Sequence, residues 1–266
     1  MPRLEGSTAI ITGAAHGIGN GMARVLAAEG AALALCDIDP AVEGLAAELE
    51  AGGANVLAEL ADVREAADVR RFVDAAIARF GRVDTMVSNA GIWRGTSPLD
   101  PWEKASDDFD ALIATNLKGV FLCGRAIAPH MAKNGSGHIV SVATDHISPP
   151  PGYSTGGGTN MDVYDASKWG INGLTQAWAR ALGPYGVRVN ALCMDATDSN
   201  MLRGALGRTP PPELLKHWMR PEQIGGLLAD LLAEGPQGRT GENIGIWVGH
   251  DVVLPPRQEA LPSRFN

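Results

Sequence analysis

The fold is predicted from one stretch near the amino terminus, Thr8-Ala9-Ile10-Ile11-Thr12-Gly13-Ala14-Ala15-His16-Gly17-Ile18-Gly19. Its first five residues are an apolar run typical of a buried strand, and the apolar residues after Gly17 recur at helical spacing. Glycines in such a turn let the backbone bend tightly and approach a pyrophosphate, whose charge meets the free N–H groups of the following helix. A glycine-rich turn alone is a common loop, but this one lies between a strand and a helix. We therefore predict a dinucleotide-binding turn made by Gly13, His16, Gly17, Ile18 and Gly19.

Strand-like apolar runs alternate with segments of helical period along the whole chain, as expected for parallel strands joined by crossover helices. The predicted strands are 8–12, 33–37, 55–60, 85–89, 138–142, 187–192 and 243–248. They predict an α/β fold, a doubly wound (Rossmann) seven-stranded parallel sheet flanked by helices. No composition shift marks a linker, so we expect one domain over 1–266, with pocket insertions at about 148–163 and 196–220 and a tail at 255–266.

Composition narrows the classes of partner. The net charge of −8 and the lack of a basic block disfavour nucleic acid and anionic membranes, which leaves small molecules. Three cysteines, Cys36, Cys123 and Cys193, lack the spacing of a disulfide framework or a metal site and are expected to be buried thiols in a reducing compartment. No apolar run approaches a membrane span, and the early first strand leaves no room for a secretion signal. We expect a cytoplasmic protein without a metal ion.

The segment Tyr164-Asp165-Ala166-Ser167-Lys168 is predicted to begin a long helix. Positions four apart share a helix face, so the phenol of Tyr164 and the ammonium of Lys168 should project side by side. Lowering a phenol pKa from about 10 towards 7 takes about 4 kcal/mol, which the ammonium could supply with the help of a bound cofactor cation. The pair predicts a proton shuttle near neutral pH, and the alternative is a solvated helix face.

Asp37 ends the second predicted strand, where an acid can bond the adenosine ribose hydroxyls. A carboxylate there repels a 2′-phosphate, and neither Ile38 nor Asp39 offers a positive charge to hold one. The position therefore favours NAD over NADP as cofactor, and the alternative is an Asp that caps the next helix.

Two further groups of residues are candidates for the cofactor site. Asp62 and Val63 end the third predicted strand and could contact the adenine edge, or Asp62 could cap the following helix. Asn89-Ala90-Gly91 ends the fourth, where small residues allow close approach to a ligand or simply form a turn.

Together these residues resemble the short-chain dehydrogenase/reductase family, in its compact single-domain branch. The likeness runs through nearly the whole chain: the turn at 12–19, Asp62-Val63, Asn89-Ala90-Gly91, Asn116 followed by Gly119, Tyr164 with Lys168, and Arg188-Val189-Asn190. The resemblance implies an NAD(P)-dependent dehydrogenase or reductase acting on CH–OH groups, and a homotetramer or homodimer.

The resemblance also implies roles for individual residues. Tyr164 is similar to the family's general acid/base, and Lys168 to the residue that lowers its pKa and bonds the nicotinamide ribose. Asn116 resembles the residue that holds a water of the proton relay. Thr144 aligns with a position that is usually Ser, and Ser141, deeper in the same strand, is the alternative.

The sixth predicted strand is followed by a departure from the family pattern. Thr197 and Ser199 align with positions that bond the nicotinamide carboxamide, but Cys193-Met194-Asp195 stands where relatives usually have Pro-Gly. The backbone that carries the two hydroxyls is therefore expected to differ.

The predicted substrate walls mix apolar and polar side chains. They include Trp93, Asp145, His146, Tyr153 and Met194, with Tyr153 and the neighbouring glycines forming a lid. Such walls suit an alicyclic or aromatic secondary alcohol, a diol among the options. Two other functions stay open: an NAD-binding relative without turnover that acts as a regulator, and a lyase or epimerase that uses NAD transiently.

Overall fold

A single parallel sheet of seven strands forms the centre of the computed structural model, which describes residues 2–206 and 210–258. The strands follow the order β3-β2-β1-β4-β5-β6-β7. Their bounds are β1 Thr8–Thr12, β2 Ala32–Asp37, β3 Val56–Leu60, β4 Thr85–Ser88, β5 Gly137–Thr144, β6 Val187–Met194 and β7 Asn243–Ile246. This arrangement confirms the predicted doubly wound sheet.

Two strands extend past their predicted ends. β5 and β6 each run two residues further, to Thr144 and Met194, because the two strands stay paired in register up to Thr144 opposite Met194. The sequence after Val142 has no apolar run that would reveal this pairing. As a result, Thr144 and Met194 lie on adjacent strands at the carboxyl edge of the sheet.

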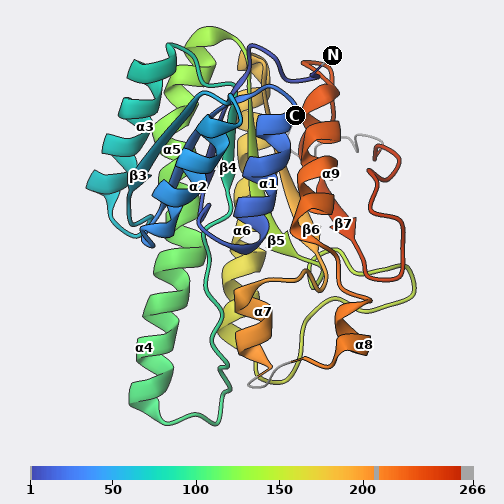
Figure 1. Cartoon of the computed structure of the whole chain (residues 1–266). Helices are drawn as coiled ribbons and strands as arrows, with labels where there is room; N and C mark the ends of the chain where they lie inside the picture. Colours follow the sequence, from blue (N-terminus) through green and yellow to red (C-terminus); the bar gives the residue numbers. More distant parts are fainter. Residues whose placement is uncertain (1, 207–209, 259–266) are drawn as a thin grey trace.

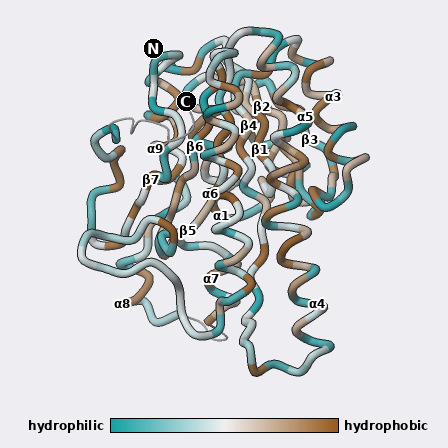
Figure 2. The backbone as a smooth tube through the Cα atoms, turned by 180° about the vertical axis from the view of Figure 1, so that it is seen from behind, coloured by the Kyte–Doolittle hydropathy of each residue, from teal (hydrophilic) through white to brown (hydrophobic). Residues whose placement is uncertain are grey.

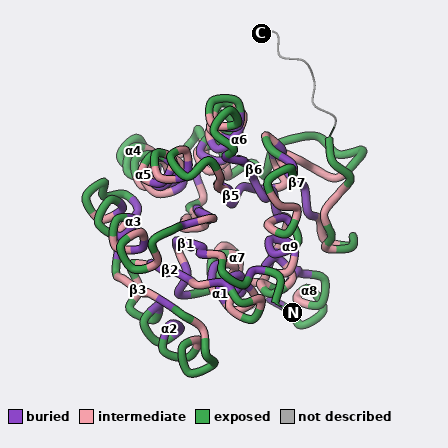
Figure 3. The backbone as a smooth tube through the Cα atoms, turned by 90° about the horizontal axis from the view of Figure 1, so that it is seen from above, coloured by how far each residue is buried: buried purple, intermediate pink, exposed green. Residues whose placement is uncertain are grey.

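Helices cover both faces of the sheet (Figures 1 and 3). One layer holds α1 Gly17–Ala28, α2 Ala41–Ala51 and α9 Pro221–Ala233, and the other holds α3 Ala66–Phe80, α5 Gly119–Asn134 and α6 Asp162–Leu182. Met22 and Leu227 are buried in the core of the first layer, Phe72 and Ile127 in that of the second. The three cysteines are free and buried, as predicted.

α5 continues a longer helical run. α4 Trp102–Leu112 passes through a π-helical turn, η1 Ile113–Lys118, into α5, and α4 projects beyond the sheet (Figure 1). By length and composition this run, Trp102–Asn134, is long and apolar enough to span a membrane. The sequence analysis expected no such segment and therefore overlooked it. Its most apolar window is 44% buried inside the fold, and α5 packs against α3 and the sheet, as the helices of a protein core do.

Two short helices, α7 Asn200–Ala205 and α8 Pro212–Leu215, lie near the carboxyl ends of the strands. The last element, η2 Gly183–Tyr185, links α6 to the start of β6. The segment 148–161 loops out without a helix or a strand before it enters α6 (Figure 1), and it is pale to hydrophilic beside the hydrophobic strands (Figure 2). Of the predicted tail, residues 259–266 lie outside the described residues.

Candidate active site

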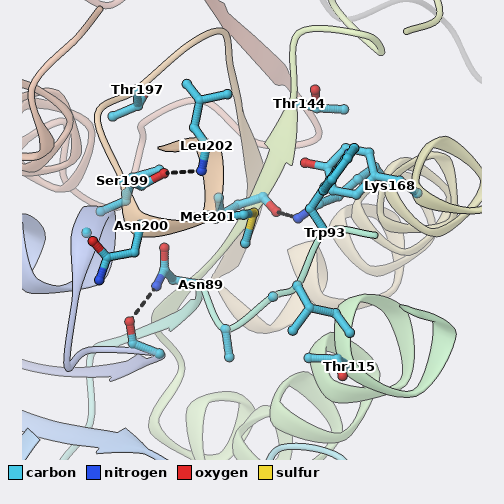
Figure 4. A pocket seen from close by; sticks show the side chains of 18 of the residues that line it. Asn89, Trp93, Thr115, Thr144, Lys168, Thr197, Ser199, Asn200, Met201 and Leu202 are labelled. Carbon is cyan, nitrogen blue, oxygen red and sulfur yellow. Dashed lines mark hydrogen bonds between the residues drawn. The ribbon is translucent and has the colours of Figure 1, made fainter. Parts of the chain in front are cut away.

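A cavity of about 580 Å³ opens where β1, β4, β5 and β6 end. Most of the residues predicted for the site line it: Gly13, His16, Gly17, Ile18, Asp37, Ile38, Asp62, Val63, Asn89, Ala90, Gly91, Trp93, Thr144, Asp145, His146, Tyr164, Lys168, Met194, Thr197 and Ser199. Figure 4 shows Thr144 and Lys168 on one side, with Thr197, Ser199 and Leu202 on the other. Gly19, Asn116 and Tyr153 do not line it.

The glycine turn has the backbone that an approaching phosphate needs. Gly13 and Gly17 have φ angles of 66° and 53°, and a Cβ on Gly13 would lie 2.7 Å from the Cα of Ala90. The first turn of α1 carries no acidic residue, and the side chain of His16 at its N-cap makes no capping hydrogen bond. The positive end of α1 is thus free for an anion.

Gly19 does not line the cavity and instead allows α1 to pack closely against the turn. A Cβ there would lie 2.2 Å from the carbonyl oxygen of Gly13, so a glycine is required for α1 to pack against the turn. Asn89 braces the same turn, because its side-chain amide donates to the carbonyl oxygens of Thr12 and Gly13 at 3.0 and 2.9 Å.

The acidic residues beside the turn are held by specific partners. The carboxylate of Asp37 accepts from the backbone N–H of Ala15 at 3.0 Å and of Asp39 at 3.1 Å. His16 Nε2 lies 2.9 Å from a carboxylate oxygen of Asp39. Further along the wall, Asp62 is paired with Arg64 rather than facing the cavity alone, and Arg64 holds the pKa of Asp62 below its usual range.

Tyr164 and Lys168 lie in the first two turns of α6, as predicted. Lys168 Nζ is 5.7 Å from the centre of the Tyr164 ring and donates to the carbonyl oxygen of Val142 at 2.9 Å. Lys168 is only 5% exposed. Its burial lowers the pKa of Lys168 to about 8.

The protein's own groups raise the pKa of Tyr164. Burial raises it, and the negative charges of Asp145 and Asp165 add to the rise, while the Thr144 hydroxyl opposes it. These groups of the protein therefore do not by themselves produce the lowering of the Tyr164 pKa that was expected from Lys168 and a bound cofactor. The sequence could not reveal this, because both the burial of Tyr164 and its proximity to Asp145, which follows β5, depend on contacts between distant segments.

Thr144, rather than Ser141, faces the cavity. Its hydroxyl donates to Asp145 Oδ1 at 3.2 Å. Ser141 is 2% exposed and does not line the cavity. This placement favours Thr144 of the two candidates named from the sequence.

Asn116 lies behind the cavity wall, fully buried in the π-helical turn. Its Oδ1 accepts from the N–H of Ile92 at 2.8 Å, and its Nδ2 donates to the carbonyl oxygen of Ile92 at 3.0 Å and to Ser167 Oγ at 3.2 Å. The side chain thus ties the segment after β4 to α6. Both N–H groups of its side-chain amide therefore have protein acceptors, and its role in holding a water stays a prediction.

His146 and the segment 148–161 form the outer wall. His146 Nδ1 lies 2.6 Å from Asp165 Oδ1, and its ring packs edge-on against Tyr164 with 6.2 Å between centroids. Gly156 N donates to the carbonyl oxygen of His146 at 2.9 Å. Tyr153 is 75% exposed and does not line the cavity, so its place in a substrate wall or lid stays a prediction.

Asp195 stabilises the backbone that follows β6. Its carboxylate accepts from the N–H of Ala196 at 2.6 Å and of Val248 at 3.1 Å. Its carbonyl oxygen accepts from the Thr197 hydroxyl at 3.1 Å, and the Ser199 hydroxyl caps α7. The chain that carries Thr197 and Ser199 is therefore tied to the end of β7 through Asp195.

Sequence reasoning missed several lining residues. They are Arg64, Arg94, Ala111, Thr115 and Val142. Ala111 and Thr115 are four apart on the helical run that carries Asn116, a spacing that marks one face and could have identified them. No cluster of three or more potential metal-ligating side chains occurs in 2–206 and 210–258.

Comparison with known proteins matches residues 7–207 to the short chain dehydrogenase family model. The chain is 36% identical to the oxidoreductase UcpA of Escherichia coli (strain K12), over 91% of this chain and 85% of that protein. It is 37% identical to levodione reductase of Leifsonia aquatica, over 79% and 76%. The solved 7α-hydroxysteroid dehydrogenase complexed with NADH and 7-oxo glycochenodeoxycholic acid has a TM-score of 0.82 at 26% identity, covering 95% of this chain and 97% of that one.

The chain belongs to the short-chain dehydrogenase family. Proteins of this family are oxidoreductases that use a nicotinamide cofactor and act on small molecules.

Proposed function

We propose that this protein is an NAD-dependent dehydrogenase or reductase that interconverts a secondary alcohol, alicyclic or aromatic and including diols, with its ketone. One observation carries the proposal: Thr144, Tyr164 and Lys168 line the same cavity as the glycine turn at the start of α1. A regulator without turnover has no need of this juxtaposition. Lyase or epimerase relatives tend to carry an added substrate domain. The seven strands of the described chain form one sheet, which leaves no separate sheet for such a domain within the described residues.

Each residue has a defined task in the reaction. A nicotinamide cofactor held at the glycine turn would supply the hydride acceptor for the carbinol carbon in the oxidative direction. Thr144 donates to the substrate oxygen, and Tyr164 takes the hydroxyl proton as general base. Lys168 bonds the nicotinamide ribose, and its positive charge, together with that of the oxidised cofactor, opposes the burial that raises the pKa of Tyr164. Asn116 positions the wall by bonding Ile92 and Ser167.

NAD is favoured over NADP by the groups near the end of β2. Asp37 presents a carboxylate there, and Ile38 beside it is 67% exposed and uncharged. Two lining side chains that could carry a positive charge, His16 and Arg64, are paired with Asp39 and Asp62. A 2′-phosphate at this strand end would meet the negative charge of Asp37 while His16 and Arg64 are already engaged by carboxylates.

Asp37→Asn should reduce the preference for NAD over NADP by about ten-fold, since the amide keeps an acceptor for Ala15 but removes the charge that repels the 2′-phosphate. The ratio of kcat/KM for the two cofactors measures the effect. Asp107→Asn, an exposed Asp on α4, is the matched control and should keep the wild-type ratio. An unchanged ratio in Asp37→Asn would remove Asp37 from cofactor selection.

Thr144→Val should lower kcat by about 10²-fold or more, because it replaces the hydroxyl by a methyl of similar size. Thr144→Ser should retain most of the rate. Ser141→Ala, which removes a hydroxyl outside the cavity, should cost far less than Thr144→Val. The reverse ranking of the two variants would mean that Ser141 is the donor.

The substrate class is inferred from the cavity walls. Trp93, Met161, Met194 and Leu202 supply apolar surface, and Asp145 and His146 are polar. A cavity of about 580 Å³ lies within the range of roughly 300–1,000 Å³ that holds small-molecule ligands. These walls suit a ring that carries a small number of oxygen substituents.

A homotetramer, or a homodimer, is the proposed assembly. Phe109, Phe121 and Trp169 on α4, α5 and α6 are 41–49% exposed, which is apolar surface that a second copy could cover. We also propose that the protein works in the cytoplasm, where its three free thiols would stay reduced.

A panel of secondary alcohols incubated with NAD, followed by NADH absorbance, tests the proposed function. At least one alicyclic or aromatic alcohol should give NADH, and its ketone should consume it. Absence of NADH formation and consumption across the panel, with the purified protein binding NADH, would favour the regulator.

A further inference from the structure

We propose that Asp145 selects substrates that carry a second hydroxyl on the carbon next to the reacting carbinol, that is, vicinal diols or the corresponding hydroxyketones. The inference deepens the proposed function and rests on it. It follows from the position of the Asp145 carboxylate, from its having Thr144 as its one side-chain donor among the described residues, and from its distance to the Thr144 hydroxyl.

The Asp145 carboxylate lines the cavity next to the reacting groups. Thr144 Oγ1, which would hold the substrate oxygen, lies 3.2 Å from Asp145 Oδ1. The backbone N–H of Asp145 donates to the carbonyl oxygen of Met194 at 3.2 Å, which fixes the residue at the end of β5 against β6. Two oxygens in a gauche arrangement on adjacent carbons of a ring lie about as far apart as the two oxygens of a hydrogen bond. When a substrate oxygen takes the Thr144 proton, Asp145 Oδ1 loses that donor, and the hydroxyl on the adjacent carbon can donate to it instead.

The carboxylate is short of donors. Its side chain is 22% exposed, and within the described chain Thr144 is the one other residue that donates a hydrogen bond to it. The nearest histidine nitrogen, His146 Nε2, stands 3.9 Å away and is held back by the contact of the same ring with Asp165. A largely buried carboxylate whose single side-chain donor is a neutral hydroxyl is costly, so a ligand hydroxyl that donates to it is stabilised.

Other charges near Asp145 argue for a hydroxyl rather than an ammonium as that donor. Burial and the charge of Asp195 raise the pKa of Asp145, which weakens its hold on a cation. Lys168 lies in the same cavity, and an oxidised nicotinamide would add a further positive charge there. An amino alcohol would place its ammonium close to both, whereas a neutral hydroxyl avoids the repulsion.

Matched pairs of substrates test the inference: cyclohexanol against cyclohexane-1,2-diol, and 1-indanol against indane-1,2-diol. The wild-type protein should show a kcat/KM at least ten-fold higher for the diol of each pair. Asp145→Leu should bring the ratio close to one, and Asp145→Asn should lower it by about ten-fold, because hydrogen bonds to charged groups are about this much stronger than neutral ones. The ratio cancels any general effect of the substitutions on Tyr164.

Asp107→Asn, which removes one exposed charge on α4, should keep the wild-type ratio. If Asp145→Leu does not fold, Asp145→Asn carries the test. Equal rates for diol and mono-alcohol in the wild type, an unchanged ratio in Asp145→Asn, or a preference for 2-aminocyclohexanol over the diol would each overturn the inference. Failure of the proposed function is distinct, because then neither member of either pair would yield NADH.

Discussion

Tyr164→Phe should lower kcat by about 10²–10⁴-fold while leaving the affinity for NADH within a few-fold of wild type. The phenyl ring keeps its packing against His146 but has no proton to accept or donate, and a positioned acid/base contributes a factor of this size. Steady-state rates with an alcohol from the panel and a fluorescence titration of NADH measure the two effects.

Tyr153→Phe is the matched control for this variant. Tyr153 is 75% exposed and lies outside the cavity, so the same chemical change there should leave both quantities at wild-type values. Turnover in Tyr164→Phe close to that of Tyr153→Phe would remove the acid/base assignment.

Lys168→Met should abolish most turnover and also stabilise the protein at low pH. Burial lowers the pKa of Lys168 to about 8 in the folded state, below its ordinary value of about 10.4. Folding therefore favours the neutral amine of Lys168. The stability of the folded protein that depends on this neutral form is fully present above the pKa of Lys168 in the unfolded chain, and it is lost as the pH falls through 8. At pH 6 the buried ammonium costs about 3 kcal/mol, which methionine, of similar length, avoids.

Urea unfolding at pH 6 and pH 10 measures this difference. The stability advantage of Lys168→Met over wild type should be greatest at pH 6 and mostly gone by pH 10, with a constant offset for the lost hydrogen bond to Val142. Lys133→Met, an exposed site in α5, should show no such pH dependence. A pH-independent difference for Lys168→Met would contradict the lowered pKa.

The strands and most of the site could be predicted because their signals are local. Apolar runs mark the buried strands, and parallel strands bring their carboxyl ends to one edge, so residues such as Asp37, Asn89 and Thr144 were expected to meet there. The helical spacing of Tyr164 and Lys168 placed them on one face in the same way.

The features that the sequence did not reveal depend on contacts between distant segments. Asp195 bonds the N–H of Val248, more than fifty residues away, and no local pattern signals that partner. The raised pKa of Tyr164 arises from Asp145 on a separate segment as well as from burial. The segment 148–161, which carries the exposed Tyr153, is likewise attached through bonds of Gly156 and Gly157 to the distant residues His146 and Asp165.

The central claim is that Tyr164 and Lys168 serve hydride exchange between an alcohol and a nicotinamide bound at the glycine turn. The most direct test supplies NAD and an alcohol of the panel labelled with deuterium on its carbinol carbon, and analyses the reduced cofactor by mass spectrometry. Wild-type protein should transfer one deuterium to the nicotinamide, and Tyr164→Phe should transfer it at least about a hundred-fold more slowly. Unlabelled cofactor from the wild type, or equal transfer by the two proteins, would contradict the claim.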